Sequence, residues 1–301
     1  GSTMDVVLDT GVTVTLSSIS GAELSGTYTV GATGSGENTA DLTVSSITSE
    51  AVDDTLGTTQ TGSSVPTAPN NIADTSDIVV DTTAPSIAVD TAVTTPTNDG
   101  TPDYSFTTNE NGTYALAGSC QSATATAVTS GTVTITLDSD GASTPLADGT
   151  YTDCDVTVTD ASGNTSSVLE INDFTVDTTA PTLAEVTPVT SPTSDTTPDW
   201  TFSSNEAGTI AYSGSCSSAT TAATSGNNTV TFNALADGTY TDCDITVTDA
   251  AGNTSGILEA SDFTVDSSAP TLQSFTSTTA DATYGPTDTI NITATYDENL
   301  G

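Results

Sequence analysis

Two nearly identical stretches carry the residues best suited to chemistry. GTYTDCDVTVTDASGNTS occupies residues 149–166, and GTYTDCDITVTDAAGNTS occupies residues 238–255. Each sets a cysteine among aspartates. Carboxylate oxygens are ligands for hard cations such as Ca²⁺, and thiols form disulfides or bind softer metals. The chemistry to be decided is therefore cation binding and covalent cross-linking.

Residue types that are absent exclude whole classes of function. The 301 residues include 39 Asp and Glu but no Lys, Arg or His, which gives a net charge of −39. Without His there is no Ser–His or Cys–His nucleophile and no His-ligated zinc. Without Lys or Arg, the chain has no phosphate-loop lysine and no electrostatic attraction to nucleic acid. We expect no nucleic-acid partner, and we expect any partner held by charge to be a cation.

Composition alone places the chain near the boundary of disorder. Hydrophobic residues make up 34% and aromatic residues 5%, and this low share is combined with high net charge. The apolar residues are nevertheless arranged in a pattern, and the length predicts two or three domains. No stretch is long and apolar enough to cross a membrane, and GSTMDVVLDTG lacks the regions of a signal peptide, so we expect no membrane insertion by this segment.

A recurring hexapeptide divides the chain. VDTTAP occupies residues 80–85 and 176–181, and VDSSAP occupies residues 265–270. The copies are roughly 90 residues apart, which fits one β-sandwich domain per repeat. Each later copy begins within an alternating DFTVD run, and the proline that follows ends strand pairing. The hexapeptides are therefore predicted domain boundaries.

Within the repeats the apolar pattern has period two and predicts strands. In residues 182–265 the successive predicted strands are PDWTFSS, TIAYSG, NTVTFNAL, DCDITVTD and GILEASDFTVD. Trp200 and Phe202 share one strand face, and Tyr104 and Phe106 take their places in residues 86–176. We interpret Trp200 as a core residue; an exposed sugar-stacking role is the alternative. No window has helical periodicity.

In one predicted strand the alternation of apolar residues is shifted by one position. Tyr151 lies one position out of step with Val156 and Val158. A β-bulge near residues 152–153 would let Tyr151 and Cys154 both turn inward.

The motifs LADGTYT, VTDASGN or VTDAAGN, and VDTTAP, in this order, resemble the tandem bacterial immunoglobulin-like (Big-type) repeats of giant extracellular adhesins or surface filaments. The resemblance covers nearly the whole chain. It implies an all-β fold of tandem immunoglobulin-like β-sandwiches in an elongated array, export to the extracellular space or cell surface, end-to-end stacking, and calcium at the joints.

The implied domains are unequal. Residues 86–181 and 182–270 are each expected to form a complete domain with a disulfide. Residues 1–85 look like the C-terminal portion of such a domain, and residues 271–301 like only its N-terminal strands. We hypothesise that residues 1–80 of a neighbouring copy complete the last piece, head to tail. The alternative is that the ends fall at arbitrary points within a domain.

The four cysteines are predicted to form one disulfide per domain. Cys120 and Cys154 lie in one repeat, and Cys216 and Cys243 occupy matching positions in the next. The even count and matched positions favour disulfides over free thiols. A Cys₄ zinc site would need all four together, which separate domains disfavour. Disulfides place the protein in an oxidising compartment.

In the immunoglobulin-like arrangement that the resemblance implies, the loop with Glu110 or Glu206 and the loop with Asp160 or Asp249 lie at the same end of a domain as the incoming link. The carboxylates of the loops and of the link should therefore meet at each joint. We therefore expect Ca²⁺ at three joints, because this ion takes 6–8 oxygen ligands. Mg²⁺ fits less well, and the alternative is that Asp, Asn and Gly only form turns. The expected ligands are Asp81, Glu110, Asp160 and Asn164; Asp177, Glu206, Asp249 and Asn253; and Asp266, Asp297 and Glu298 with Asp53 and Asp54 from the complementary piece.

A second acidic cluster is expected at the opposite end of each domain, where turn chemistry is strong and a metal is less favoured. It comprises Asp99, Asp103 and Asp148 in one repeat and Asp195, Asp199 and Asp237 in the next.

The leading hypothesis is a calcium-stiffened extracellular structural protein, a segment of an adhesin or filament, and not an enzyme. Its expected partners are neighbouring repeats or copies of the same chain, with a cell-surface or glycan ligand elsewhere in a longer protein. The alternative is a carbohydrate-binding or accessory module of a secreted enzyme, which would need an exposed aromatic platform. Paired carboxylates alone could also support a glycosidase, but nothing in the sequence indicates the cleft.

Overall fold

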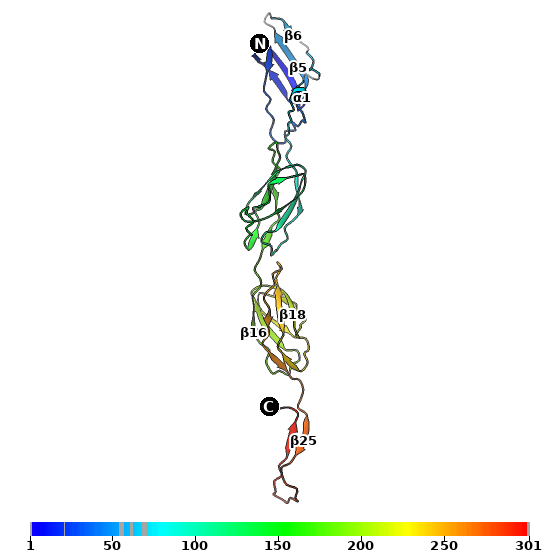
Figure 1. The fold of residues 1–301 in the computed structure, drawn as a ribbon, viewed down its shortest axis with the longest axis vertical. Coiled ribbons are helices and arrows are strands. Elements are labelled where there is room, and N and C mark those ends of the chain that lie inside the picture. The colour runs from blue at the N-terminus through cyan, green and yellow to red at the C-terminus, as the bar shows by residue number, and fades with distance from the viewer. Residues whose placement is uncertain (1, 21, 54–56, 61–62, 68–70, 300–301) are drawn as a thin grey trace. The chain divides into compact units, whose positions relative to one another are not determined.

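The computed structural model describes residues 2–20, 22–53, 57–60, 63–67 and 71–299, and it is almost entirely β (Figure 1). The expected all-β class is confirmed, in the form of several small antiparallel sheets. The chain divides into two compact units, Gly1–Asp177 and Thr178–Gly301, and each is described separately.

The first unit contains the first repeat, residues 86–177. Its strands form two main sheets, in the orders β10-β9-β13-β14 and β11-β8-β7, and a small pair β12-β15. The strands are β7 (Ile87–Thr91), β8 (Asp103–Thr108), β9 (Gly112–Ala117), β10 (Ala127–Val128), β11 (Gly131–Thr136), β12 (Gly149–Tyr151), β13 (Asp155–Thr159), β14 (Leu169–Glu170) and β15 (Phe174–Val176).

Alternation along the strands builds the core of this repeat. Tyr104 and Phe106 of β8 and Val156 and Val158 of β13 are all fully buried in one cluster. Residues i and i+2 of a strand share a face, so each strand turns these apolar side chains toward the core. The hydroxyl of Tyr104 is buried and has no hydrogen-bond partner among the described residues.

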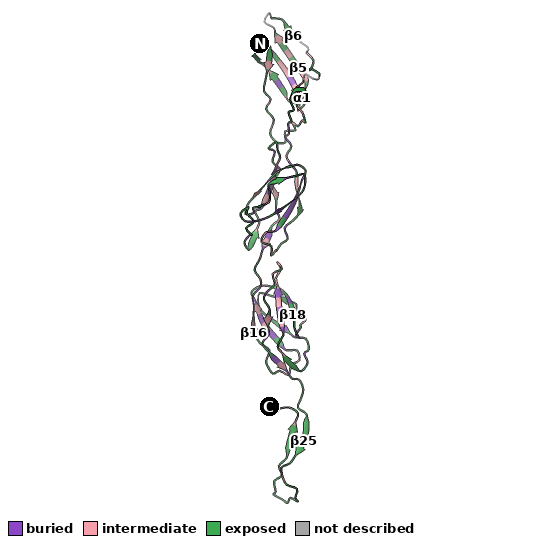
Figure 2. Ribbon diagram, in the orientation of Figure 1, coloured by how far each residue is buried: buried purple, intermediate pink, exposed green. Residues whose placement is uncertain are grey.

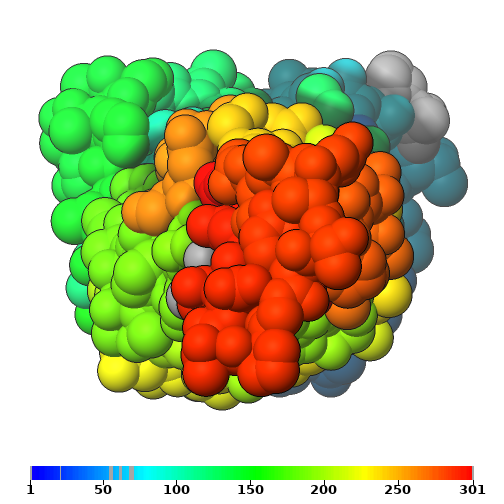
Figure 3. All heavy atoms as spheres, turned by 90° about the horizontal axis from the view of Figure 1, so that it is seen from below, coloured from blue at the N-terminus to red at the C-terminus, as the bar shows by residue number. Residues whose placement is uncertain are grey.

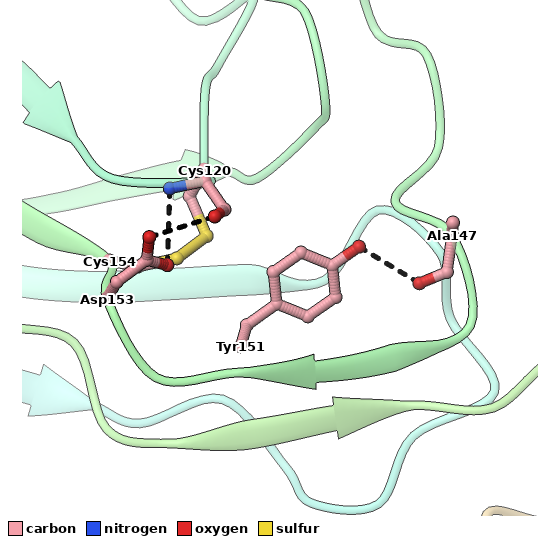
Figure 4. The surroundings of a disulfide bond; sticks show 6 residues. Cys120, Ala147, Tyr151, Asp153 and Cys154 are labelled. Atoms are coloured by element: carbon pink, nitrogen blue, oxygen red, sulfur yellow. Dashed lines mark hydrogen bonds between the residues drawn. A yellow bond between two sulfur atoms is a disulfide. The ribbon is translucent and has the colours of Figure 1, made fainter.

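The stretch GTYTDCD at residues 149–155 is interrupted between two strands, at the position where the sequence predicts a β-bulge. β12 pairs with β15, whereas β13 pairs with β9 and β14, so the chain moves from one sheet to another across residues 152–154. Tyr151 stacks on Phe174 with ring centroids 5.2 Å apart. Its hydroxyl donates to Ala147 O at 2.9 Å, as Figure 4 shows. The register offset therefore arises from a change of sheet.

Both predicted disulfides are confirmed. Cys120 bonds Cys154 beside this interruption (Figure 4), and Cys216 bonds Cys243 at the matching place, with Cα atoms 5.5 and 4.9 Å apart. Gly118 precedes the first bond with φ +84°, and a Cβ there would lie 1.7 Å from Asp153 O. Only glycine allows the two segments to approach this closely.

Residues 2–80 complete the first unit with a smaller set of elements. Their core is formed by Val6, Leu8, Val14, Leu42 and Val80. The main sheet has the order β2-β1-β5-β6, and a hairpin β3-β4 stands apart. The elements are β1 (Thr3–Leu8), β2 (Thr13–Leu16), β3 (Ser18–Ser20), β4 (Glu23–Ser25), β5 (Val44–Asp53), β6 (Thr59–Gln60) and α1 (Ile72–Thr75).

Helix α1 occurs although no window of the sequence has helical periodicity. It is a single turn, capped by Asn71 in a capping box with Asp74. Four residues are too few to generate a periodic apolar pattern, so the local signal is the cap alone.

The second unit repeats the sheets of the first repeat in residues 182–266. The orders are β19-β18-β22-β23, β16-β17-β20 and β21-β24, and a final hairpin β25-β26 follows. The strands are β16 (Leu183–Thr187), β17 (Asp199–Ser204), β18 (Gly208–Ser213), β19 (Ala222–Ala223), β20 (Gly226–Thr231), β21 (Gly238–Tyr240), β22 (Asp244–Thr248), β23 (Leu258–Glu259), β24 (Phe263–Val265), β25 (Leu272–Thr276) and β26 (Thr293–Tyr296).

Trp200 lies at the centre of the second core, as expected. It is fully buried, with its ring centroid 5.5 Å from that of Phe202 and 6.0 Å from that of Phe232. Its Nε1 donates to Glu185 Oε1 at 2.7 Å, and the same carboxylate accepts from the N–H and hydroxyl of Ser261. The indole donor is therefore satisfied inside the core, unlike the hydroxyl of Tyr104.

Candidate metal centre

The loop after β13 is organised around the carboxylate of Asp160. The backbone N–H groups of Ser162 and Asn164 both donate to Asp160 Oδ1 at 2.8 Å, and the backbone N–H of Asp160 donates to Asn164 O at 3.0 Å. Gly163 supplies the positive φ (+90°) that closes the turn. The sequence DASGN therefore holds one carboxylate in a fixed position.

A second loop brings Glu110 alongside. Thr108 Oγ1 donates to Glu110 O at 3.0 Å, and Asn109 Nδ2 donates to Glu110 Oε1 at 3.2 Å. A Cβ on Gly112 would lie 2.5 Å from Thr159 O. The absence of a side chain at this position lets β9 start directly against β13, next to Asp160.

The link that contains Asp81 forms hydrogen bonds with both Asn164 and Asn38. Asn164 Nδ2 donates to Asp81 O at 3.0 Å, and Asn164 Oδ1 accepts from the Thr33 hydroxyl at 2.9 Å. Thr82 is buried, and its N–H and hydroxyl both donate to Asn38 Oδ1, at 2.6 and 2.9 Å. These contacts all lie within the first unit.

Asp81, Glu110 and Asp160 form an acidic triad. One carboxylate oxygen from each lies within 4.8 Å of the others, and all three residues are half-buried. A surface hollow of about 450 Å³ borders Asp81 and Glu110, and Asn38 and Thr83 also line it. Three of the four residues predicted for the first joint are thus brought together.

Asn164, the fourth residue predicted for this joint, has a different role. Its Nδ2 also donates to Asp160 Oδ2 at 2.9 Å, so its amide faces the triad with N–H groups. In this arrangement it braces the loop and the link, and it offers the triad no oxygen ligand.

Hydrogen bonds keep Asp160 ionised. Burial alone raises the pKa of Asp160, but the side chain of Asn164 and the backbone N–H groups of the loop outweigh it and hold the pKa below its ordinary value. Asp249 has a lowered pKa for the same reasons, with Asn253 in the place of Asn164. Hydrogen bonds to the charged form of a carboxyl favour ionisation.

The second unit repeats both loops. Asn253 N–H and Nδ2 donate to the two oxygens of Asp249, each at 2.9 Å, and Asn205 Nδ2 donates to Glu206 Oε1 at 3.0 Å. One carboxylate oxygen of Glu206 lies within 4.8 Å of one of Asp249. Asp177, predicted to join them, is the last residue of the first unit, where its N–H donates to Thr97 O at 2.9 Å.

The third predicted set is only partly gathered. The pKa of Glu298 is raised by burial and then by the negative charges of Asp266, Asp297 and Asp237, so these carboxylates are neighbours. They do not form a group as tight as the triad among the described residues. Asp53 ends β5 in the first unit, where its N–H donates to Ser2 Oγ at 2.9 Å, and Asp54 lies outside the described residues.

The second acidic cluster of each repeat forms turn hydrogen bonds. Asp99 Oδ1 accepts from Thr101 N–H at 2.8 Å, and Asp195 Oδ1 accepts from Thr197 N–H at 2.8 Å. In the part of the chain that the structure describes, neither Asp99, Asp103 and Asp148 nor Asp195, Asp199 and Asp237 make a close group.

The triad fits a hard divalent cation. Oxygens on opposite sides of one Ca²⁺ are about 5 Å apart, because each lies about 2.3–2.6 Å from the ion. Two unit charges 4 Å apart interact by about 1 kcal/mol in water and about 4 kcal/mol at an effective dielectric constant of 20. The chain has no Lys, Arg or His side chain to offset that repulsion. A bound cation would instead attract all three carboxylates.

Thr33 and Asn38 contribute to this centre but were not expected from the sequence. Both lie in loops of residues 26–40, outside the repeated aspartate motifs, and they reach the link from a region far away in the chain. Their only sequence signal is that Asn and Thr form side-chain to backbone hydrogen bonds in loops.

Comparison with protein-family models found no match, and comparison with curated proteins found no significant relative. Among the described residues, no helix is long and apolar enough to cross a membrane. The fold and the acidic triad are therefore the basis for a functional conclusion.

Proposed function

We propose that this chain is an extracellular structural protein built from tandem immunoglobulin-like β-sandwiches, in which a bound calcium ion fixes the link between domains. The observation that carries the proposal is the triad of Asp81, Glu110 and Asp160. Its three carboxylates come from the link and from two loops of the following repeat. An ion that they share would join the link to that repeat.

The donor set favours calcium. All candidate ligands are oxygens, which both Ca²⁺ and Mg²⁺ accept. Mg²⁺ demands a near-ideal octahedron at shorter distances, whereas Ca²⁺ tolerates irregular shells and adds water or carbonyl ligands. The triad stands beside an open hollow with room for such ligands. Asp81, Glu110 and Asp160 would hold the ion, and Asn164 would position the Asp160 loop and the link.

The disulfides support an extracellular location. All four cysteines are paired in two intra-repeat bonds. Such bonds persist in oxidising environments and are rare in the cytosol. The likeness of the motifs to bacterial immunoglobulin-like repeats supports the same location and an adhesin or filament role.

A carbohydrate-binding role receives less support. Such a module presents an exposed aromatic platform, but Trp200, the only tryptophan in the chain, is fully buried. We therefore retain the structural role.

Calorimetric titration tests the proposal. We expect Ca²⁺ to bind the wild-type chain and to raise its melting temperature above that in EDTA, because a ligand at a hundredfold excess over its Kd stabilises the folded state by about 2.7 kcal/mol. Glu110→Gln is expected to lose one bound ion. Glu170→Gln, which alters an exposed acid on β14, serves as the matched control and should bind like wild type.

Two outcomes would count against the proposal. Identical melting in EDTA and in Ca²⁺ would overturn the cation-fixed link. Equal stabilisation by Mg²⁺ at the same concentration would overturn the choice of calcium.

A further inference from the structure

The final hairpin reproduces, strand for strand, the first hairpin of each repeat. β25 pairs with β26 so that Leu272 lies opposite Tyr296. In the repeats, Ile87 lies opposite Thr108 and Leu183 opposite Ser204. The open end of the hairpin is also matched, because Thr271 N–H donates to Asp297 Oδ1 at 2.7 Å, as Ser86 does to Asn109 and Thr182 to Asn205.

The same hairpin is buried in the repeats and open here. β8 and β17 are central strands, flanked on the far side by β11 and β20. Tyr104 and Trp200 are fully buried there, whereas Ile292, which this register places at their position, is 69% exposed. Phe275 of β25 is 67% exposed. The hairpin is green in Figure 2, and the atoms of its residues are orange and red in Figure 3.

Residues 2–80 contain one of the two main sheets and not the other. The order β2-β1-β5-β6 corresponds to β10-β9-β13-β14 and to β19-β18-β22-β23. No counterpart of β11-β8-β7 is present among the described residues of this region. A groove of about 300 Å³ opens along the inner side of the existing sheet, lined by apolar side chains that include Val6, Leu8, Val14, Leu42, Val44 and Ile72.

One segment beside this groove matches an outer strand that lacks its partner. GTYTV at residues 26–30 resembles GTVTI at residues 131–135 of β11 and GNNTV at residues 226–230 of β20. Residues 26–30 belong to no strand, although Gly26 and Tyr28 line the groove. Val30 is 46% exposed, whereas Ile135 and Val230 at the same position are fully buried.

We propose that the β25-β26 hairpin of a second copy of this chain docks in the groove and pairs with residues 26–30. We take the register from the pairing of β8 with β11 and from the pairing of β17 with β20 in the repeats. It places Ile292 opposite Val30, Ala294 opposite Tyr28 and Thr293 opposite Thr29. Three strands then lie across the groove side of the first sheet, as they do in both repeats.

The chemistry of the two partners supports this pairing. Neither residues 26–30 nor residues 290–296 contain a charged side chain, so they can approach without the repulsion that a net charge of −39 otherwise causes. Docking would bury Ile290 and Ile292, which are 53% and 69% exposed. It would also pair the open edge of β26, and unpaired strand edges bind further strands readily.

One side-chain pair gives a direct test. Ser105 and Thr134 hydroxyls lie 2.7 Å apart across β8 and β11, and Thr201 and Thr229 hydroxyls lie 2.8 Å apart across β17 and β20. Thr293 and Thr29 are their counterparts. Thr29→Cys and Thr293→Cys chains, mixed and mildly oxidised in EDTA, are expected to form a disulfide-linked pair of chains on a non-reducing gel.

The control shifts the register by two residues. Thr29→Cys mixed with Thr295→Cys should cross-link roughly tenfold less, because diagonal neighbours are too far apart for a disulfide. Ile292→Asn should abolish concentration-dependent association in sedimentation, whereas Ile257→Asn, at a site 71% exposed elsewhere in the second unit, should not. Both isoleucines are exposed, so neither change should unfold the chain.

Two results would overturn the proposal: no cross-link together with a monomer at every concentration, or equal cross-linking in both registers. The inference rests on the proposed structural role for its purpose. Because the assay runs in EDTA, its failure would leave the calcium test untouched, and failure of the calcium test would leave the cross-link in place.

Discussion

Asn164 Nδ2 donates a hydrogen bond to the backbone carbonyl of Asp81 at 3.0 Å, across 83 positions of the sequence. The same amide accepts from Thr33 and donates to Asp160. One buried side chain therefore joins three segments, and the acidic triad depends on where they meet.

Replacing Asn164 should weaken the first unit. Asn164→Ala removes hydrogen bonds at a position that is 5% exposed, and leaving buried partners unsatisfied costs about 1–3 kcal/mol. Chemical denaturation should report this loss. Asn227→Ala, at an exposed position in β20, should change stability by no more than about 0.5 kcal/mol. Equal effects of the two variants would contradict the bracing role.

The pKa of Asp237 should be about 2, because hydrogen bonds from Ser268 and then Ser267 hold it down. A carboxyl whose folded pKa is depressed stabilises the fold above its unfolded pKa of about 3.9, and this contribution is lost as the pH falls toward the folded value. Carbon-detected NMR titration should find the low pKa. Ser268→Ala should raise it, and an unchanged titration in that variant would refute the assignment.

Removing the first disulfide should destabilise its repeat. Cys120→Ala with Cys154→Ala opens a loop with a sequence separation of 34, which the chain-entropy model values at about 3.5–4 kcal/mol. Denaturation by urea under non-reducing conditions measures this difference. The matched double variant at Cys216 and Cys243 should lose a similar amount, and losses below about 1 kcal/mol in both would contradict the model.

The Glu185 carboxylate should stabilise the second core through Trp200. Glu185→Ala leaves the fully buried indole N–H without its 2.7 Å acceptor, at a cost of about 1–3 kcal/mol. Combining it with Trp200→Phe, which removes the donor, should cost less than the two single changes added together. Strict additivity in this double-mutant cycle would show that the hydrogen bond contributes nothing.

The strand pattern was readable from the sequence because it is local. Alternating apolar residues put Trp200 with Phe202, and Tyr104 with Phe106, on inner faces. The matched positions of Cys120, Cys154, Cys216 and Cys243 sufficed for both disulfides. The strand predictions required only a two-residue apolar period, and the disulfide predictions required only the internal repeat.

Long-range contacts were less accessible. The sequence could mark Asp160 and Asn164 as neighbours in a turn, but the orientation of an amide depends on what faces it, here Asp81 O and Thr33. The break after Tyr151 resembled a bulge because both explain a one-residue offset. Only the different partners of β12 and β13 distinguish a change of sheet.

The disulfide beside that change of sheet also sets how far a repeat can be stretched. Residues between linked cysteines cannot extend under tension, and an extended chain spans at most about 3.3–3.6 Å per residue. With sequence separations of 34 and 27, the bonds withhold roughly 115 Å and 90 Å of contour length from the two repeats. Pulling would thus lengthen each of the two repeats by a shortened step, and a reducing agent would restore the missing length to each.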